Sequence, residues 1–173
     1  MKKTDIPFQK AAERTIELLQ NPGCLVACCD ADGRPNAMAI GWGLVGTVWG
    51  RPIFEILVRP SRYTYELIEA TGDFTVNVPA AGLKKAVMYC GAKSGRDEDK
   101  LAACGLEAKP SREVTSPILA DCAVHFECRV VHATDMVPPH LDGEIEDAFY
   151  GGSDYHRCYH GLIVACYGDP DVV

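Results

Sequence analysis

The feature that most constrains the fold is a series of short apolar runs separated by turn-forming residues. Between residues 24 and 59 the chain reads CLVACCD, NAMAIGWGLVG and RPIFEILVR, with the turn DADGRP between the first two. Runs of this length bounded by Gly, Pro and Asp predict β-strands, and the pair Asp32-Gly33 suits a hairpin. The spacing therefore predicts three consecutive strands in an antiparallel meander.

Further strands are expected downstream. DFTVNVP at 73–79 is an apolar run, and GEIEDAFYG at 143–151 and HGLIVACYG at 160–168 are strand candidates. DCAVHFECRVV at 121–131 alternates between two kinds of residue. This alternation predicts an inner face of Cys122, Val124, Phe126, Cys128 and Val130, and an outer face of His125, Glu127 and Arg129.

Helices interrupt these strands. KAAERTIELLQ at 10–20 has helical spacing and is followed by Asn-Pro-Gly. A second helix is expected after Pro60, with Ser61 or Thr64 as its cap, and is expected to end at Gly72. Two more are expected, one over 80–91 and a short one capped by Asp97 and ended by Gly105. Strands still dominate, so the pattern predicts a mainly β fold, a closed antiparallel β-barrel with outer helices, in one domain over 1–173.

Composition narrows the class of protein. The net charge of −7 and pI of about 5.2 argue against nucleic acid or an anionic membrane as the main partner. The start of the chain has no apolar signal region and no run is long enough to cross a bilayer, which favours a cytoplasmic protein. The nine cysteines include no CxxC pair and mostly occupy apolar runs, so we interpret them as reduced core residues.

The strand at 36–46 has an unusual division of residue sizes. Its small residues share one face and its large ones the other. The small face is Ala37, Ala39, Gly41 and Gly43, and the large face is Met38, Ile40, Trp42 and Leu44. Two interpretations stand equally: a shallow groove for a flat aromatic ring, or close packing of a helix on the sheet.

The segment RPSRYTYELIEATGDFTVNVP at 59–79 places two arginines at the start of a helix that already carries partial positive charge. Backbone N–H groups there bind phosphate, the hydroxyls of Ser61 and Thr64 add donors, and Arg59 and Arg62 suit the same oxygens. The alternative is surface ion pairing of the arginines with Glu66 or Glu69. The combination favours a phosphate site.

A third segment, GAKSGRDEDK at 91–100, combines a flexible turn around Ser94 with a lysine, Lys100, one helical turn after Arg96. A lysine can hold a ring oxygen or a phosphate as a point charge. The alternative is a plain connection in front of an acidic helix.

Together these segments resemble the flavin reductase-like FMN-binding split-barrel family, and most of all its flavoredoxin-type members. The resemblance covers most of residues 10–145 and rests on NAMAIGWG, VRPSRYTYELIEATGDFTVNVP, CGAKSGRDEDK and MVPPHLDGEI. It implies a split barrel, FMN as cofactor and a homodimer with flavin near the interface. The segment FYGGSDYHRCYHGLIVACYGDPDVV departs from the family pattern, because it lacks the usual closing strand.

The resemblance also implies roles for single residues, taken at the matching positions. The isoalloxazine ring would lie against Asn36, Ala37, Met38, Ala39 and Trp42. The phosphate and ribityl chain would be held by Arg59, Ser61, Arg62, Tyr63 and Thr64. Ser94 and Lys100 would cover the cofactor, with Lys100 near the pyrimidine edge of the ring. His140 would approach the ring from its loop.

The implied function is that of a flavin-dependent oxidoreductase, with the redox step supplied by FMN. One hypothesis is a reductase that takes electrons from NADH or NADPH, a second is an electron carrier served by a redox partner protein, and a third is a cysteine-rich metal-binding protein. No acid–base pair stands out, so no catalytic residue is assigned. In HRCYH, His156 and His160 suit metal chelation on a helix, but a mobile polar segment near the flavin is the favoured interpretation.

Overall fold

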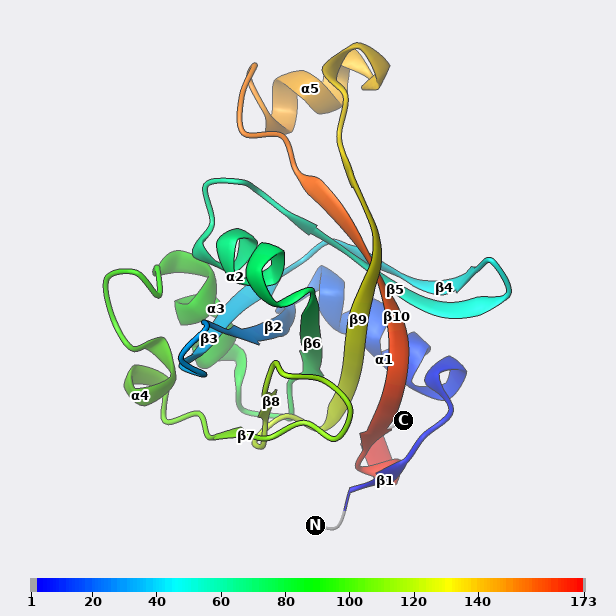
Figure 1. Ribbon diagram of the computed structural model, residues 1–173, viewed down its shortest axis with the longest axis vertical. Helices are drawn as coiled ribbons and strands as arrows, with labels where there is room; N and C mark the ends of the chain where they lie inside the picture. The colour runs from blue at the N-terminus through cyan, green and yellow to red at the C-terminus, as the bar shows by residue number, and fades with distance from the viewer. Residues whose placement is uncertain (1–2, 173) are drawn as a thin grey trace.

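The computed structural model describes residues 3–172, and its frame is one antiparallel sheet. The order of the strands is β3-β2-β6-β9-β10-β5-β4, with β1 paired to β10 (Figure 1). The bounds are β1 Thr4–Asp5, β2 Cys24–Cys29, β3 Pro35–Ile40, β4 Gly43–Val48, β5 Arg51–Val58, β6 Asp73–Val78, β9 Val124–Asp135 and β10 Arg157–Gly168. A separate pair is β7 Ala108–Lys109 with β8 Ile118–Leu119. Residues 1, 2 and 173 of the predicted domain lie outside the described residues.

The mainly β, antiparallel prediction is confirmed, but the prediction of a closed barrel is wrong. Among the described residues no ladder joins β3 to β4, the two ends of the sheet. The reason lies in the run 36–46, which breaks at Gly41 and Trp42 instead of forming one strand. Its first half pairs with β2 and its second half with β5, so the expected meander is two hairpins at opposite ends of the sheet.

The expected helices are present, with differences at their caps. They are α1 Phe8–Gln20, α2 Tyr63–Thr71, α3 Lys84–Ala92 and α4 Lys100–Cys104. Gly72 ends α2 in the left-handed region at φ 72°, as predicted. The residue before α2 is Arg62, without a side-chain cap, and Asp99 caps α4 instead of Asp97 by accepting from the Ala102 N–H.

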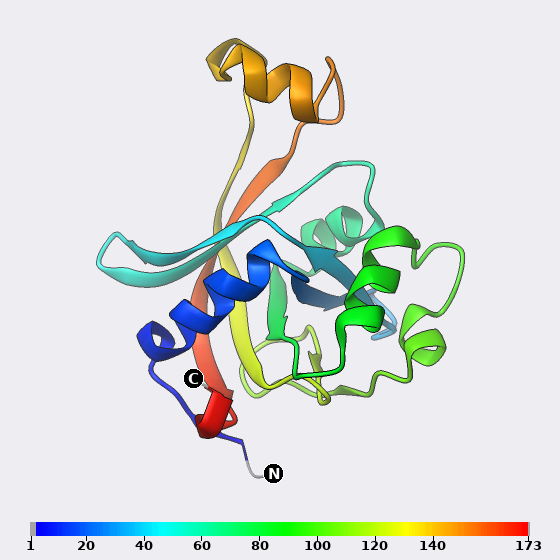
Figure 2. The same cartoon turned by 180° about the vertical axis from the view of Figure 1, so that it is seen from behind.

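The core has two parts, separated by β2. Alternate residues of β2 face a cluster inside the curved sheet, which contains Phe54, Phe74 and Phe126, and a second cluster under α3. Ala37 of β3 packs in this second cluster with Val87 of α3. Because both faces of β2 are covered, every residue in it is buried. Figure 2 shows α3 and α4 on this side of the sheet.

The outer face predicted for β9 is partly wrong. Arg129 is exposed, but His125 and Glu127 are fully buried. The segment before β8 folds over this face: Glu127 accepts from the N–H groups of Arg112 and Glu113 at 2.8 and 2.7 Å, and from Tyr167 Oη at 2.5 Å. The carboxylate is therefore buried with its hydrogen bonds satisfied.

The C-terminal part differs most from expectation. Residues 143–149, expected as a strand, form the helix α5 Gly143–Phe149, with Asp142 accepting from the Glu144 N–H at 2.9 Å. The segment 149–173 does supply a long strand, β10, which lies between β9 and β5. In HRCYH, His156 precedes this strand and residues 157–160 begin it, so the segment is extended and does not form the helix that metal chelation by His156 and His160 would need. Figures 1 and 2 show α5 standing clear of the sheet on the extended ends of β9 and β10.

The cysteines behave as core residues. All nine are free thiols, seven of them buried, and burial raises the pKa of Cys24 to about 12. In residues 3–172 no group of three or more His, Cys, Asp or Glu side chains is placed to hold a metal ion. No helix in the described part of the chain is long and apolar enough to cross a membrane.

Candidate functional site

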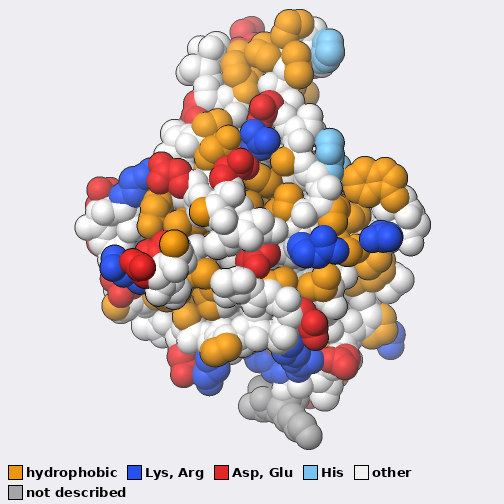
Figure 3. All heavy atoms as spheres, viewed as in Figure 1, with side chains coloured by type: hydrophobic (Ala, Val, Ile, Leu, Met, Phe, Trp, Pro, Cys, Tyr) orange, Lys and Arg blue, Asp and Glu red, His pale blue; other side chains and the backbone are white. Residues whose placement is uncertain are grey.

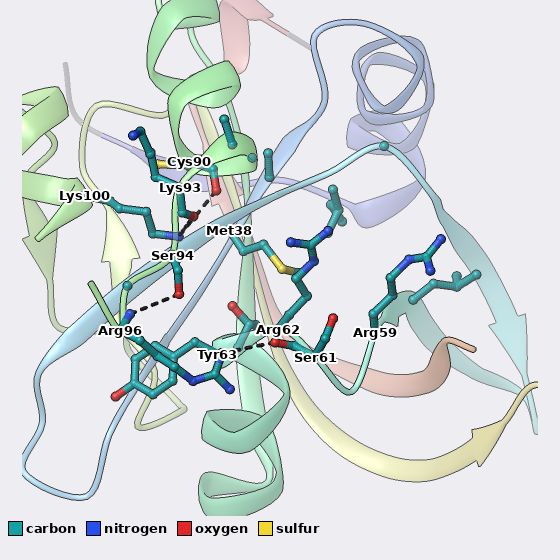
Figure 4. A pocket seen from close by; sticks show the side chains of 18 of the residues that line it. Met38, Arg59, Ser61, Arg62, Tyr63, Cys90, Lys93, Ser94, Arg96 and Lys100 are labelled. Carbon is teal, nitrogen blue, oxygen red and sulfur yellow. Dashed lines mark hydrogen bonds between the residues drawn. The ribbon is translucent and has the colours of Figure 1, made fainter. Parts of the chain in front are cut away.

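A pocket of about 540 Å³ lies between the end of β3, the start of α2 and the α3–α4 connection (Figure 4). Three segments distant in sequence therefore meet at one place. Ten of the thirteen residues that the sequence predicts for the site line this pocket: Met38, Ala39, Trp42, Arg59, Ser61, Arg62, Tyr63, Thr64, Ser94 and Lys100. Their contact with a cofactor stays a prediction.

The start of α2 supplies the predicted anion site. Thr64 is buried, and its hydroxyl accepts from Asn36 Nδ2 at 3.0 Å. Arg62 is exposed, and its side chain has no hydrogen bond or ion pair among the described residues and extends beside Met38 (Figure 4). Its guanidinium is therefore available to an anion in the pocket.

The alternative interpretation of these arginines is wrong. Glu66 pairs with Arg96 at 2.5 Å. Glu69 accepts from Tyr159 Oη at 2.7 Å and pairs with Arg157 at 3.4 Å. Both carboxylates thus have other partners, and neither neutralises Arg59 or Arg62.

Arg59 has a different role from Arg62. It donates to the carbonyl oxygens of Phe149 at 2.6 Å and Asp154 at 3.2 Å. The Asp154 carboxylate in turn accepts from Ser61 N–H at 3.1 Å and from Ser61 Oγ at 2.7 Å. Burial alone would raise the pKa of Asp154, but the Ser61 hydrogen bonds and the charges of Arg59 and Arg62 lower it.

Lys100 lies on the opposite wall of the pocket, with its side chain buried. Its ammonium donates to the carbonyl oxygens of Cys90 at 3.4 Å and Lys93 at 3.2 Å, at the C-terminal end of α3 (Figure 4). An ammonium has three donor hydrogens, so one is left for a ligand. Burial lowers the pKa of Lys100, and the carbonyl dipoles at the helix end favour its charged form.

The turn 93–97 connects the two walls. Ser94 Oγ accepts from the Arg96 N–H at 3.2 Å, and Arg96 donates to the Ser61 carbonyl at 3.1 Å while its guanidinium lies over the Tyr63 ring at 5.3 Å. Sequence reasoning did not assign Lys93 or Arg96 to the site. Their charges beside Ser94 were the signal that could have identified them.

His156 was not assigned to the site as a single residue, although its segment was expected near the flavin. It precedes β10 and lines the pocket beside Trp42, with 5.1 Å between the ring centroids. Burial, together with the charge of Arg59, lowers the pKa of His156 to about 4, and Tyr150 Oη lies 2.8 Å from its Nδ1. The imidazole is therefore a neutral part of the wall at pH 7.

Three predicted residues do not line the pocket. Asn36 is buried behind it and supports Thr64, whereas Ala37 packs against α3. His140 is exposed in the 3₁₀ turn Pro138–His140, close to α5. A side chain built on Gly91 would lie 3.3 Å from the Ala39 Cβ, so the small residues of β3 mainly allow close approach of α3.

The residues present fit a flat ligand that carries a phosphate. Five basic side chains line the pocket: Arg59, Arg62, Lys93, Arg96 and Lys100. The volume falls in the range of small-molecule sites. Met38, Trp42 and His156 supply an uncharged lining for an aromatic ring, and the start of α2 supplies donors for a phosphate.

Comparison with known proteins identifies a family of flavin-related domains. Residues 17–171 match the family described as "Flavin reductase like domain". The solved structure of flavoredoxin from Desulfovibrio vulgaris (Miyazaki F) superposes with a TM-score of 0.70 at 26% identity, covering 87% of this chain and 70% of that one.

Two relatives found by sequence align with a smaller share of this chain than the flavoredoxin structure does. A protein of Archaeoglobus fulgidus is 35% identical over 98 residues, which is 57% of this chain and 55% of that protein. The FMN reductase (NADH) RutF of Variovorax paradoxus is 38% identical over 84 residues, which is 48% of this chain and 44% of that protein. The chain thus matches about half the length of each.

Proposed function

The chain belongs to the flavin reductase-like domain family, and on that premise we propose that it binds FMN in the pocket between β3, α2 and α3 and acts as an oxidoreductase. The observation that carries the proposal is the opposition of two cations across one pocket. Arg62, whose guanidinium has no partner in residues 3–172, stands just before α2. The buried Lys100 begins α4, and its ammonium lies at the C-terminal end of α3. These positions suit the two negatively charged ends of a reduced flavin nucleotide.

The chain's own residues would hold and orient the cofactor. Arg62, Ser61 and the first N–H groups of α2 would bind the phosphate, and Tyr63 and Ser94 would flank the ribityl chain. Lys100 would donate to the pyrimidine edge and favour the anionic reduced ring. Bound FMN would supply hydride or electron transfer at N5 of its ring.

We propose FMN rather than FAD, because the basic residues of the pocket form one cluster around the start of α2 and the facing turn. A dinucleotide would need further donors for a pyrophosphate. Mass spectrometry of the cofactor released by heating should show FMN, and mainly FAD would contradict the proposal.

The electron donor is proposed to be NADH or NADPH, and the Variovorax relative, an FMN reductase (NADH), supports a nicotinamide donor. The second candidate is an electron carrier reduced by a redox partner protein, which the flavoredoxin likeness supports. The absorption spectrum of the purified protein should show flavin bands that bleach anaerobically with NADH or NADPH. Bleaching only by a reduced partner protein would favour the carrier, and a colourless protein that takes up no flavin would refute both.

We further propose a homodimer. A second hollow of about 420 Å³ adjoins the first and shares Gly41, Trp42 and Leu57 with it. Its lining is mostly apolar and includes Leu44, which is 66% exposed. Figure 3 shows hydrophobic side chains on the surface of the β4–β5 hairpin and of α5. A second copy would cover this surface and the open side of the flavin pocket. A cytoplasmic location is proposed with it, since nine free thiols suit a reducing compartment.

A further inference from the structure

The carboxylate of Asp154 lies where a phosphate is expected. Its two oxygens accept from the N–H and the Oγ of Ser61, and Oδ2 lies 3.8 Å from Arg59 Nη1. Ser61 stands two residues before the first residue of α2. These are donors that the proposed function assigns to the FMN phosphate.

Asp154 reaches the site from a distant segment, 93 residues along the chain from Ser61. It belongs to the α5 lobe, defined here as residues 138–155, which stands clear of the sheet (Figures 1 and 2). Asp154 has φ 53°, and Gly151 and Gly152 before it are also in the left-handed region. Arg59 fixes the lobe by donating to the carbonyls of Phe149 and Asp154. The lobe is thus attached to the anion site through Arg59 and Ser61.

The two anions exclude each other at Ser61. A backbone N–H and a hydroxyl each offer a single donor hydrogen, and Asp154 uses both. The hydrogen bonds and nearby arginine charges lower the pKa of Asp154 against the effect of burial, so the carboxylate is ionised at pH 7. A phosphate that takes these donors must displace a carboxylate and would otherwise be repelled by it.

We propose that Asp154 is a built-in competitor for the cofactor phosphate, and that the α5 lobe closes the phosphate end of the pocket until FMN displaces it. This inference rests on the proposed function. Asp154 is tethered to the site and therefore competes at high effective concentration. The apparent affinity for FMN is the affinity of the open lobe multiplied by the fraction of molecules in which the lobe is open. FMN is then an exchanging ligand whose entry opens the lobe.

The test compares FMN with riboflavin, which has the same ring and no phosphate, in the wild type and Asp154→Asn. Asparagine tolerates the left-handed region, so the change removes the charge without straining the backbone. We expect FMN to bind about tenfold more tightly to the variant, the value for one charge-assisted hydrogen bond, with riboflavin affinity unchanged. Asp147→Asn removes the same charge from an exposed position on α5 and should alter neither affinity.

Flavin fluorescence titrations separate the outcomes. Equal or weaker FMN binding by Asp154→Asn, with riboflavin still bound, would overturn the competitor role while leaving the proposed function in place. Failure of all three proteins to bind either flavin would overturn both. Hydrogen exchange gives an independent readout: FMN, but not riboflavin, should increase exchange in the α5 lobe, residues 138–155. Protection of this lobe by FMN would contradict the opening.

Discussion

The ammonium of Lys100 donates to the carbonyl oxygen of Lys93 over 3.2 Å, where α3 ends. A buried cation is thereby held by the negative end of a helix instead of by a carboxylate. Because no acid neutralises it among the described residues, its charge remains directed at the pocket it lines. This arrangement supports an electrostatic role for Lys100, and the role can be measured.

Replacing Lys100 by methionine should make reduction of bound FMN less favourable. The variant loses the positive charge that stabilises the anionic reduced ring, and we expect the two-electron midpoint potential to fall by about 30 mV, which corresponds to about 1.4 kcal/mol. Spectroelectrochemical titration measures the shift. Lys85→Met changes an exposed lysine of α3 outside the pocket and should leave the potential unchanged. An equal potential in all three proteins would place Lys100 away from the ring.

Arg62→Ala should weaken FMN binding and leave the fold intact. Loss of a charge-assisted contact costs about 1.5–3 kcal/mol, so the dissociation constant should rise about ten- to a hundredfold. Arg34→Ala is a matched control, because Arg34 pairs only with the exposed Asp32 on the β2–β3 turn. Flavin titration gives both values, and an unchanged affinity for Arg62→Ala would count against the phosphate site.

Stability should fall as the pH drops below about 6.5. His125 Nδ1 lies 2.7 Å from Asn77 Oδ1, Nε2 contacts the Lys3 ammonium, and burial lowers the pKa of His125 to about 3. Below the ordinary histidine pKa of about 6.5, His125 is protonated in the unfolded chain but stays neutral in the folded chain. Each such histidine should remove about 1.4 kcal/mol per pH unit between those values.

Urea unfolding at pH 7 and pH 5 tests this dependence. His156, with a pKa of about 4, contributes in the same direction, so the informative quantity is the slope. His125→Gln should be less stable than wild type at pH 7 but should lose less stability between the two pH values. Equal slopes in the two proteins would mean that His125 is not the responsible group.

Gly161→Ala should destabilise the fold. A Cβ at this position of β10 would lie 2.5 Å from Phe74 Cζ and 2.7 Å from Cys128 Cβ, inside the core. Overpacking of this kind costs about 1–3 kcal/mol. Gly46→Ala in β4 has open space around the new methyl group and serves as control. Denaturant midpoints report the difference in stability. A Gly161→Ala protein as stable as Gly46→Ala would show that the core rearranges around the added methyl group at little cost in free energy.

Leu44→Glu should convert the proposed dimer into a monomer. Leu44 is the most exposed apolar side chain of the second hollow, and a buried charge there would have no partner. Sedimentation equilibrium should give twice the chain mass for the wild type and the chain mass for the variant. Met88→Glu, at a 62% exposed residue of α3, should remain dimeric. A monomeric wild type that still binds FMN tightly would exclude a shared site.

The sequence determined the local elements and most of the pocket. Glycine at 72 and 105 ended helices as predicted, because glycine adopts the left-handed conformation after the last turn more easily than any other residue. Arg59, Ser61, Arg62 and Thr64 were recognisable because the signal for an anion site is confined to a few residues just before and within the first turn of one helix. Residues close in sequence carry such information without reference to the rest of the chain.

Tertiary packing decided the rest. Alternation along β9 placed His125 and Glu127 outside, but the segment before β8 covers that face. The periodicity of one strand carries no information about a cover that comes from another part of the chain. The break of 36–46 at Gly41 depends on pairing with two different strands. The position of Asp154 at Ser61 joins residues 93 apart, and no local pattern specifies such a contact. Long-range contacts of this kind depend on the free energy of the whole packed structure, so they are defined only once the chain has folded.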